Sequence, residues 1–300
     1  MNLIKEIDNQ LIDYDKIKSN SIFKIQNNKE EYDLNFIITV RDRINFKEPL
    51  FEAFVKACEK VDRKIAYTVV EHSQRPDHSK YCKNNNINYI FIPAEQDELF
   101  NKCLAYNFGA LFSVKAKYHL FHDIDILMQS SFFEDIFTYI DRDVKALQCY
   151  TGRRVINCNV EMTVKLIKGE VDVDVLDENT YGVDYPRFNG KVSLGSTGGS
   201  ILVENNLFEE IGGFDPELFK AYSAEDQFFW NKILTHTDIE YADNPAIELF
   251  HMWHEPQFNK NPRLLEMESY MNKFKELSDV ERKSVVSHKK EILKKINRDA

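Results

Sequence analysis

The chain has 300 residues, a formal net charge of −10, 29% charged residues and 43% hydrophobic residues. This balance is typical of a globular protein and excludes a chain that is disordered throughout. The acidic charge argues against a general nucleic-acid-binding protein, although a local basic pocket for a phosphorylated ligand is compatible with it.

The first half of the chain has the pattern of an α/β domain. Residues 1–33 are polar and are expected to form a helical flank. Helices are predicted after the first strand, where Pro49 lies in the first turn, and over the apolar face from Phe100 to Leu111. Strands that alternate with helices in this way predict a mainly parallel sheet with helices on both faces. In such sheets, ligands gather at the carboxyl ends of the strands. Four buried strands are predicted, at 34–40, 65–70, 89–92 and 118–121.

The second half is less regular. A helix is predicted at 131–140 and a strand at 146–150, and the stretch 151–195 is expected to form loops or a small insertion that carries Arg153, Arg154 and Arg187. Ser223 is expected to open a helix, and a late strand is predicted at 246–250. Residues 263–300 alternate Lys and Glu and are expected to be helical.

The cysteines and the N-terminus indicate a compartment. The five cysteines are scattered and form no Cys-x-x-Cys pair, which argues against a zinc ribbon or a disulfide framework and favours a reducing environment. Residues 1–16 are interrupted by charges and contain no apolar core. We therefore expect a cytoplasmic protein with neither a signal peptide nor a transmembrane segment. The cysteines are Cys58, Cys82, Cys103, Cys149 and Cys158.

Two carboxylates, Asp123 and Asp125, follow the strand predicted at 118–121. In an extended segment they would lie on the same side, with Ile124 turned toward the core. Paired carboxylates at a strand end suit a hard divalent cation that also bridges phosphate oxygens. The simpler interpretation is a pair of strand-end charges in a solvated turn.

Two histidines, His251 and His254, follow the strand predicted at 246–250. At this spacing at least one imidazole can join a metal that carboxylates already hold, and imidazole with oxygen ligands is a good set for Mn²⁺. The alternative is an ordinary surface histidine beside a packed Trp253.

Ser223 and Asp226 have the spacing of a capping box, in which Ser223 caps the helix and Asp226 is the reciprocal acid. Such a cap stabilises a helix by ~1 kcal/mol. Alternatively, Asp226 is a general base at the helix N-terminus. The two roles compete, because a capping carboxylate has its lone pairs engaged.

Arg41 and Arg43 follow the first strand, where they could bind a nucleotide diphosphate or pack on a base. Surface salt bridges are the simpler role for them. Gly198 and Gly199 would let a ligand approach the backbone, or they mark a bulge.

Taken together and in order, five segments resemble the metal-dependent glycosyltransferases of the GT-A fold, in particular the β-1,4-galactosyltransferase-like branch and its bacterial polymerising relatives. The resemblance implies an α/β, Rossmann-like, mainly parallel twisted sheet flanked by helices. It implies a single catalytic domain at 34–262, an N-terminal helical flank at 1–33 and a C-terminal helical extension at 263–300. The segments are VRDR (40–43), FNKCLAYNFGALFSV (100–114), FHDIDILM (121–128), the stretch 198–233 with its GGFD and SAED, and HMWH (251–254).

The resemblance assigns a metal and donor site. It implies Asp125 as a direct metal ligand and His254 as the residue that completes the metal shell, while His251 stands where some relatives have a further ligand. The cation would be Mn²⁺ or Mg²⁺. Asp123 would bind near the ribose or near water on the metal. The donor nucleotide-binding residues would be Arg41, Arg43 and Asp123.

The resemblance also assigns an acceptor side. It implies Asp226 as the catalytic base and Glu225 as the residue that holds the acceptor sugar. Tyr222 falls where relatives have a sugar-stacking Trp, and Gly198 and Gly199 would line the sugar cleft.

The implied function is inverting transfer of a sugar from a nucleotide-diphosphate sugar, most simply a UDP-sugar, to a hydroxyl of a saccharide or glycoconjugate in glycan biosynthesis, with no nucleic-acid partner. The alternative is a non-catalytic sugar-binding relative or a glycoside hydrolase, which uses two carboxylates without a metal. The basic run 287–298 could make peripheral membrane contact near a lipid-linked acceptor. The simpler interpretation of that run is a solvated helix face.

Overall fold

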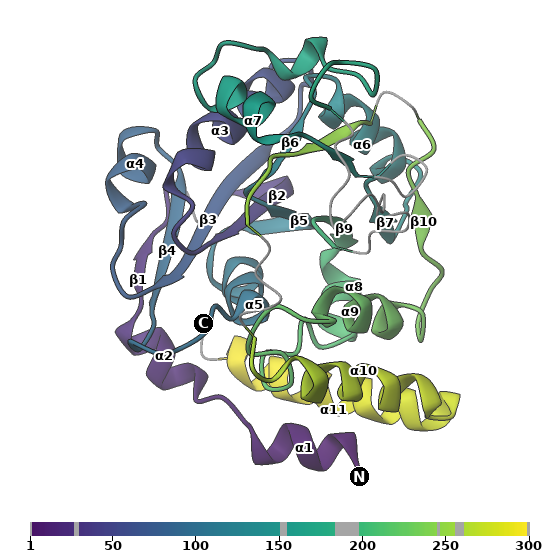
Figure 1. Ribbon diagram of the computed structural model, residues 1–300. Coiled ribbons are helices and arrows are strands. Elements are labelled where there is room, and N and C mark those ends of the chain that lie inside the picture. Colours follow the sequence, from purple (N-terminus) through teal and green to yellow (C-terminus); the bar gives the residue numbers. More distant parts are fainter. Residues whose placement is uncertain are drawn as a thin grey trace.

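A large sheet with helices on both faces forms the centre of the computed structural model (Figure 1). The structure describes residues 2–26, 30–150, 155–183, 198–244, 247–255 and 261–298, so that Arg153, Arg154, Arg187 and Ala246 lie outside the described residues. The strands, in the order of the sheet, are β1 (Ile22–Lys24), β4 (Asn88–Pro93), β3 (Ile65–Ser73), β2 (Glu31–Val40), β5 (Lys115–Asp123), β9 (Ser200–Glu204), β7 (Ala146–Gln148) and β10 (Glu240–Tyr241).

The middle of this sheet is parallel, as the sequence predicts. β4, β3, β2 and β5 run parallel to one another. In contrast, β9 is antiparallel to both β5 and β7, and β1 is antiparallel to β4. The sheet is therefore mixed as a whole. In the register of β2 and β5, Thr39 lies opposite Asp123. The residues that follow these two strands consequently emerge side by side at one edge of the sheet.

A small second sheet brings the late strand to the same edge. It consists of β6 (Ile126–Met128), β11 (Leu249–His251) and β8 (Ile156–Asn157), with β11 in the middle. β11 is antiparallel to β6, and His251 pairs with Ile126. Because Ile126 directly follows Asp125, this register sets His251 beside the second carboxylate of the Asp-Ile-Asp segment.

The central sheet separates two hydrophobic clusters. Alternate residues of β2 face opposite ways, so Phe36 and Ile38 enter the cluster under α3 while Ile37 enters the cluster against α5. The first cluster is covered by α3 (Lys47–Cys58), α6 (Phe132–Ile140) and α7 (Val160–Ile167). The second is covered by α5 (Lys102–Phe112), α8 (Asn205–Glu210), α9 (Glu225–Ile233), α10 (Leu264–Glu276) and α11 (Asp279–Arg298).

The chain ends pack on the second cluster. α1 (Leu3–Asn9) buries Leu3 and Ile7 there, and α10 and α11 bury Tyr270 and Val286 in the same cluster. Figure 1 shows α1, α10 and α11 together on one side of the sheet. Among the described residues, none of the helices combines the length and the apolar character that a membrane span requires.

In three segments of the chain, the structure contains elements that the sequence analysis did not place. The N-terminal flank is not wholly helical, because α2 (Tyr14–Asn20) is followed by β1, and β2 already begins at Glu31. A helix that was not predicted, α4 (Ser79–Asn84), connects β3 and β4. The stretch 151–195, expected to form loops or a small insertion, contains α7, β8 and the 3₁₀ turn at Val173–Val175 among its described residues. All these elements are short, so few residues are available to display a hydrophobic period.

Candidate functional site

Asp125 lies at the centre of the first group of site residues. The chain turns at Ile124 and Asp125 rather than continuing as an extended segment, so the prediction that both carboxylates share one side of a strand is wrong. The Asp125 side chain is 3% exposed, and its Oδ2 lies 2.9 Å from Nε2 of His254 and 3.8 Å from Nε2 of His251. The same oxygen accepts a hydrogen bond from the guanidinium of Arg43.

The electrostatics of this group keep Asp125 ionised. Burial by itself would raise the pKa of Asp125, but the Arg43 guanidinium and the two histidines outweigh burial and hold that pKa well below its usual range. Nδ1 of His254 lies 2.8 Å from the carbonyl oxygen of Glu255, which orients Nε2 toward Asp125. The site therefore presents an ionised carboxylate to two imidazoles.

The donor set fits a divalent cation. One ligand atom from each of Asp125, His251 and His254 can be chosen so that all three lie within 4.8 Å of one another. A carboxylate oxygen with two imidazole nitrogens can hold a first-row divalent ion such as Mn²⁺, Fe²⁺ or Zn²⁺. The histidine pair and the second aspartate, predicted from separate motifs, are thus brought together.

Lys102 lies at the centre of a second group of charged residues. Its Nζ lies 3.0 Å from Oδ1 of Asp123 and 3.2 Å from Oδ2 of Asp226. The hydroxyl of Tyr106, one turn further along α5, donates to Oδ1 of Asp123 at 3.0 Å. Asp123 is therefore directed to a different set of partners from Asp125, although only one residue separates them.

Asp226 does not cap its helix. α9 begins at Glu225 with Ala224 as the N-cap, and no side chain caps it. Oε2 of Glu225 instead accepts a hydrogen bond of 2.7 Å from the backbone N–H of Ser223. The predicted capping box of Ser223 and Asp226 is therefore wrong, because the N-cap is Ala224, one residue later than predicted. This leaves the carboxylate of Asp226 unoccupied by capping.

One oxygen of Asp226 has no partner among the described residues. Oδ2 contacts Lys102, whereas Oδ1 is buried and accepts no hydrogen bond from that part of the chain. A buried acceptor in this state is rare in folded proteins and calls for an explanation, such as a catalytic role. The geometry therefore offers Oδ1 as an acceptor for an incoming donor group.

Burial shifts the titration of the acid pair upward. Burial and the neighbouring Asp226 raise the pKa of Glu225 to about 8. Burial also raises the pKa of Asp226, and Lys102 opposes that rise. Burial alone would lower the pKa of Lys102, but Asp123 and Asp226 outweigh it and raise that pKa well above its usual value. Lys102 is thus a fixed positive charge between two carboxylates.

The glycine pair forms a wall of this second group. A Cβ on Gly198 would lie 1.8 Å from Oδ2 of Asp226, so only glycine allows the carboxylate to approach the backbone here. Gly199 has a φ of +89°, which favours glycine, and its carbonyl accepts from the Asp123 N–H at 2.8 Å. Tyr150 donates a hydrogen bond to the Gly198 carbonyl.

Tyr222 and Arg41 lie outside these two groups. Tyr222, three residues before Glu225, is 55% exposed. Its carbonyl oxygen accepts a hydrogen bond of 2.9 Å from the side chain of Asn261. Arg41 donates from its guanidinium to the carbonyl oxygen of Glu98 at 2.6 Å. Tyr222 is exposed and Arg41 is half-buried, and these hydrogen bonds join neither of them to the carboxylate groups.

Helix α5 supplies the scaffold that the sequence interpretation missed. Its N-cap, Asn101, accepts from the Leu104 N–H and donates to the Pro216 carbonyl at 3.1 Å. Asn107 clamps Phe214 through both backbone groups, at 2.8 Å and 3.1 Å. The segment 100–114 is one of the five that carry the resemblance, and this was the signal from which Lys102 could have been selected.

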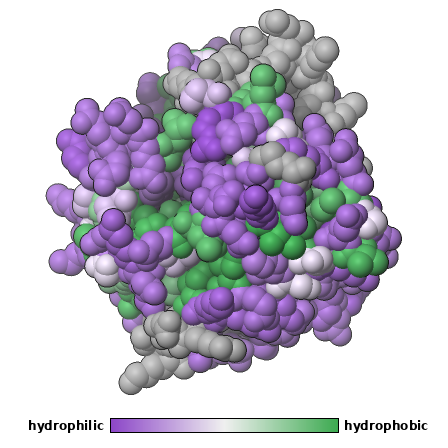
Figure 2. Space-filling view, turned by 90° about the horizontal axis from the view of Figure 1, so that it is seen from below, coloured by the Kyte–Doolittle hydropathy of each residue, from purple (hydrophilic) through white to green (hydrophobic). Residues whose placement is uncertain are grey.

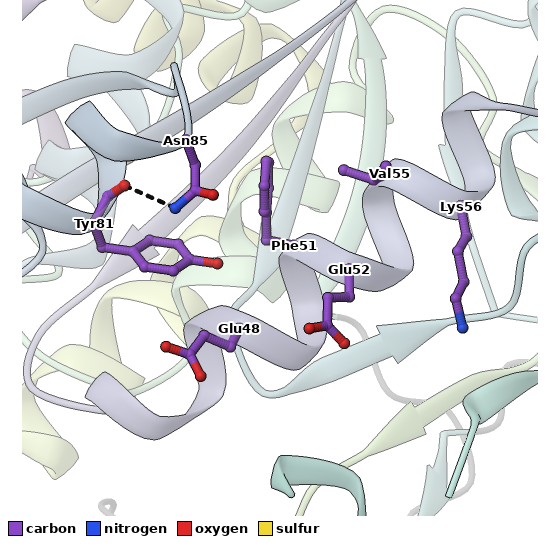
Figure 3. A pocket seen from close by; sticks show the side chains of 7 residues that line it. All are labelled: Glu48, Phe51, Glu52, Val55, Lys56, Tyr81 and Asn85. Carbon is purple, nitrogen blue, oxygen red and sulfur yellow. Dashed lines mark hydrogen bonds between the residues drawn. The ribbon is translucent and has the colours of Figure 1, made fainter. Parts of the chain in front are cut away.

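A groove elsewhere on the molecule is separate from this site. It lies between α3 and α4, has a volume of about 460 Å³, and is lined by Phe51 and Tyr81 with Glu48 and Glu52 beside them (Figure 3). None of the predicted site residues lines it.

Comparisons with known proteins identify the fold. No family model matches the sequence, and no curated protein matches it. Solved structures do match. TarS of S. aureus in complex with UDP-GlcNAc has a TM-score of 0.52 at 13% identity, over 84% of this chain and 70% of that one. GalNAc-T7 with UDP, GalNAc and Mn²⁺ has a TM-score of 0.55 at 13% identity, over 84% of this chain and 50% of that one.

Drosophila β1,4-galactosyltransferase 7 with xylobiose also matches, with a TM-score of 0.46 at 13% identity over 77% of this chain and 73% of that one. The likeness to TarS and GalNAc-T7 shows that this chain has the GT-A fold, as the sequence predicts.

Proposed function

We propose that this chain is a glycosyltransferase that moves a sugar from a UDP-sugar to a hydroxyl of a saccharide or glycoconjugate, with inversion and with Mn²⁺. One observation carries the proposal. A metal donor set around Asp125 and a buried acid pair at the start of α9 lie at the same edge of a GT-A sheet, linked through Asp123 and Lys102. The ligands present in the TarS and GalNAc-T7 structures support UDP as the nucleotide and Mn²⁺ as the cation.

The donor side follows from the first group. Asp125, His251 and His254 would hold the divalent cation, which supplies positive charge to stabilise the leaving diphosphate. Asp123, Arg41 and Arg43 would contact the nucleotide from the ends of β2 and β5. Lys102 is a further positive charge at this edge, with its side chain only 11% exposed, and its contacts hold the side chains of Asp123 and Asp226 in place.

The acceptor side follows from the second group. A sugar hydroxyl is a weak acid, so a carboxylate must accept its proton as it attacks. Asp226 is the proposed base because its buried Oδ1 has no partner among the described residues, while Oδ2 is oriented by Lys102. Glu225 would hold the acceptor sugar, Tyr222 would stack on it, and Gly198 and Gly199 would line its cleft. A base on the acceptor side implies in-line attack and inversion.

The test is calorimetric titration of the protein with UDP in the presence and absence of Mn²⁺. We expect UDP to bind tightly only with Mn²⁺, and we expect Asp125→Ala to abolish this dependence because the cation loses its carboxylate ligand. Asp141→Ala is the matched control, since Asp141 is an exposed aspartate that pairs with Arg63 at 2.6 Å.

UDP binding that is equally tight with and without Mn²⁺, or that survives unchanged in Asp125→Ala, would contradict the proposal. No UDP binding under any condition would favour the alternative of a glycoside hydrolase, which needs neither a nucleotide nor a metal.

A further inference from the structure

The cation that sits nearest to Asp125 belongs to the chain itself. The Arg43 guanidinium bonds to Oδ2 of Asp125, and its second nitrogen lies 3.2 Å from Nε2 of His254. Oδ2 and Nε2 are also atoms of the proposed metal donor set. The guanidinium therefore lies among the donors that a divalent cation would use.

The backbone is built to aim Arg43 at this place. Asp42 and Arg43 have φ values of +62° and +38°, and two consecutive non-glycine residues with positive φ are uncommon. Such a conformation persists only where its surroundings over-determine it. Nε2 of His78 lies 2.9 Å from the carbonyl oxygen of Asp42, so a side chain from another part of the chain stabilises this turn.

A buried carboxylate anchors that contact in turn. Glu71 is 0% exposed, and its Oε2 accepts from the His78 N–H at 3.1 Å and from the Tyr89 hydroxyl at 2.5 Å. The turn that carries Arg43 is thus tied to the core of the sheet through His78. Arg41, two residues earlier, makes a different contact, with the Glu98 carbonyl.

We propose that Arg43 is an internal counter-ion that competes with the divalent cation for Asp125 and is released to the diphosphate of the donor when the metal binds. This inference rests on the proposed function. A cation held by Asp125 and His254 would lie where the guanidinium lies, and two positive charges repel at such short range, so metal binding frees the guanidinium. A freed guanidinium pairs well with phosphate oxygens, to which it can donate two parallel hydrogen bonds.

The competition makes metal and nucleotide binding cooperative. A ligand whose site is available in only a fraction of molecules binds with an affinity reduced by that fraction. Without nucleotide, the Arg43–Asp125 contact lowers the affinity for metal. With nucleotide, the diphosphate receives Arg43 and removes the competitor, so each ligand strengthens the binding of the other.

The test is titration with Mn²⁺ alone, followed by the electron paramagnetic resonance signal of the free ion. If Arg43 occupies Asp125 in about nine molecules in ten, Arg43→Met binds Mn²⁺ about tenfold more tightly than the wild type. Arg142→Met is the matched control, since Arg142 is an exposed arginine that pairs with Glu240 at 3.4 Å, and we expect it to change the Mn²⁺ affinity less than about twofold because salt screens a charge that does not touch the site. UDP should then tighten Mn²⁺ binding more in the wild type than in Arg43→Met.

Two results would overturn the inference: an Arg43→Met protein that binds Mn²⁺ no more tightly than the wild type, or an Arg142→Met protein that gains as much affinity as Arg43→Met. If Arg43→Met does not fold, Arg43→Gln carries the same expectation. Mn²⁺ binding that is lost in Asp125→Ala but unchanged in Arg43→Met overturns this inference alone. A wild-type protein that binds no Mn²⁺ overturns the proposed function as well.

Discussion

Lys102 lies between the carboxylates of Asp123 and Asp226 and contacts both. It contacts Asp123 on the donor side and Asp226 on the acceptor side, and its side chain is only 11% exposed. A buried ammonium between two carboxylates stabilises their charged forms. Substitution of Lys102 should therefore change the pKa of Asp226, the proposed base.

We expect Lys102→Met to shift the pH dependence of turnover. Burial raises the pKa of Asp226 and Lys102 lowers it, so loss of the ammonium raises that pKa further. Asp226 then becomes ionised only at higher pH, and the acidic limb of the kcat profile moves upward. The control is Lys117→Met, which removes an exposed lysine that pairs with Asp33 at 3.3 Å. An acidic limb that stays in place in Lys102→Met would contradict the role of Lys102.

The same residue shows where prediction at this scale stops. Asp123, Asp125, His251 and His254 stand out in the sequence because metal-ligating side chains follow buried strands in close succession. A single lysine at the start of an amphipathic helix gives no such signal, since lysines on helices are usually exposed. Only the packing of α5 against the start of α9 makes it a buried charge.

At the scale of elements, strand ends were more predictable than helix starts. β2 and β5 are 10 and 9 residues long, with continuous buried runs, so their ends and the residues beyond them could be read directly. The start of α9 could not, because Ser223 and Asp226 have the spacing of a capping box while Glu225 accepts the Ser223 N–H instead. Asp226 contacts Lys102, a tertiary contact that the local pattern does not encode, and no side chain caps α9.

The small second sheet is the element that the sequence could not supply. Its strands are two or three residues long and come from three distant parts of the chain. Its pairing of His251 with Ile126 is what sets the histidines beside Asp125. Separate motifs predicted the members of the metal donor set, but their meeting depends on long-range pairing that no local pattern encodes.

At the scale of the whole molecule, the C-terminal helix is tied to the core by buried charges. Nζ of Lys289 lies 2.6 Å from Oε2 of Glu217 and 4.0 Å from Oδ1 of Asp215, and Lys232 of α9 lies 2.5 Å from Asp215. All four side chains are at most 2% exposed. The network connects α11 to the helix that carries the acid pair.

We expect Lys289→Met to lower the free energy of unfolding by about 3–5 kcal/mol, because it leaves a buried carboxylate without its partner. Lys290→Met is the matched control. Its ammonium pairs with Glu210 at the surface, and its loss should cost about 0–1 kcal/mol. Urea denaturation of both variants measures the difference. Equal losses in the two variants would contradict the account of the buried network.

The basic run 287–298 is largely engaged within the molecule. Beside Lys289 and Lys290, His288 lies 2.7 Å from Asp8, and Lys294 lies 3.0 Å from Glu291. The face seen from below, on the side of α10 and α11, mixes hydrophilic residues with hydrophobic ones (Figure 2). Because Lys289 is buried, the run is not simply a solvated helix face, and membrane contact stays a prediction.

The most direct test of the central claim is sugar transfer by Asp226→Asn. UDP release is measured from UDP-GlcNAc, UDP-GalNAc, UDP-Gal and UDP-Glc with Mn²⁺ and a panel of saccharide acceptors. The account predicts that Asp226→Asn lowers turnover by about 10²–10⁴-fold, the contribution typical of a general base, while UDP binding with Mn²⁺ is retained. Turnover in Asp226→Asn close to that of the wild type would contradict the claim that this carboxylate accepts the proton of the acceptor hydroxyl.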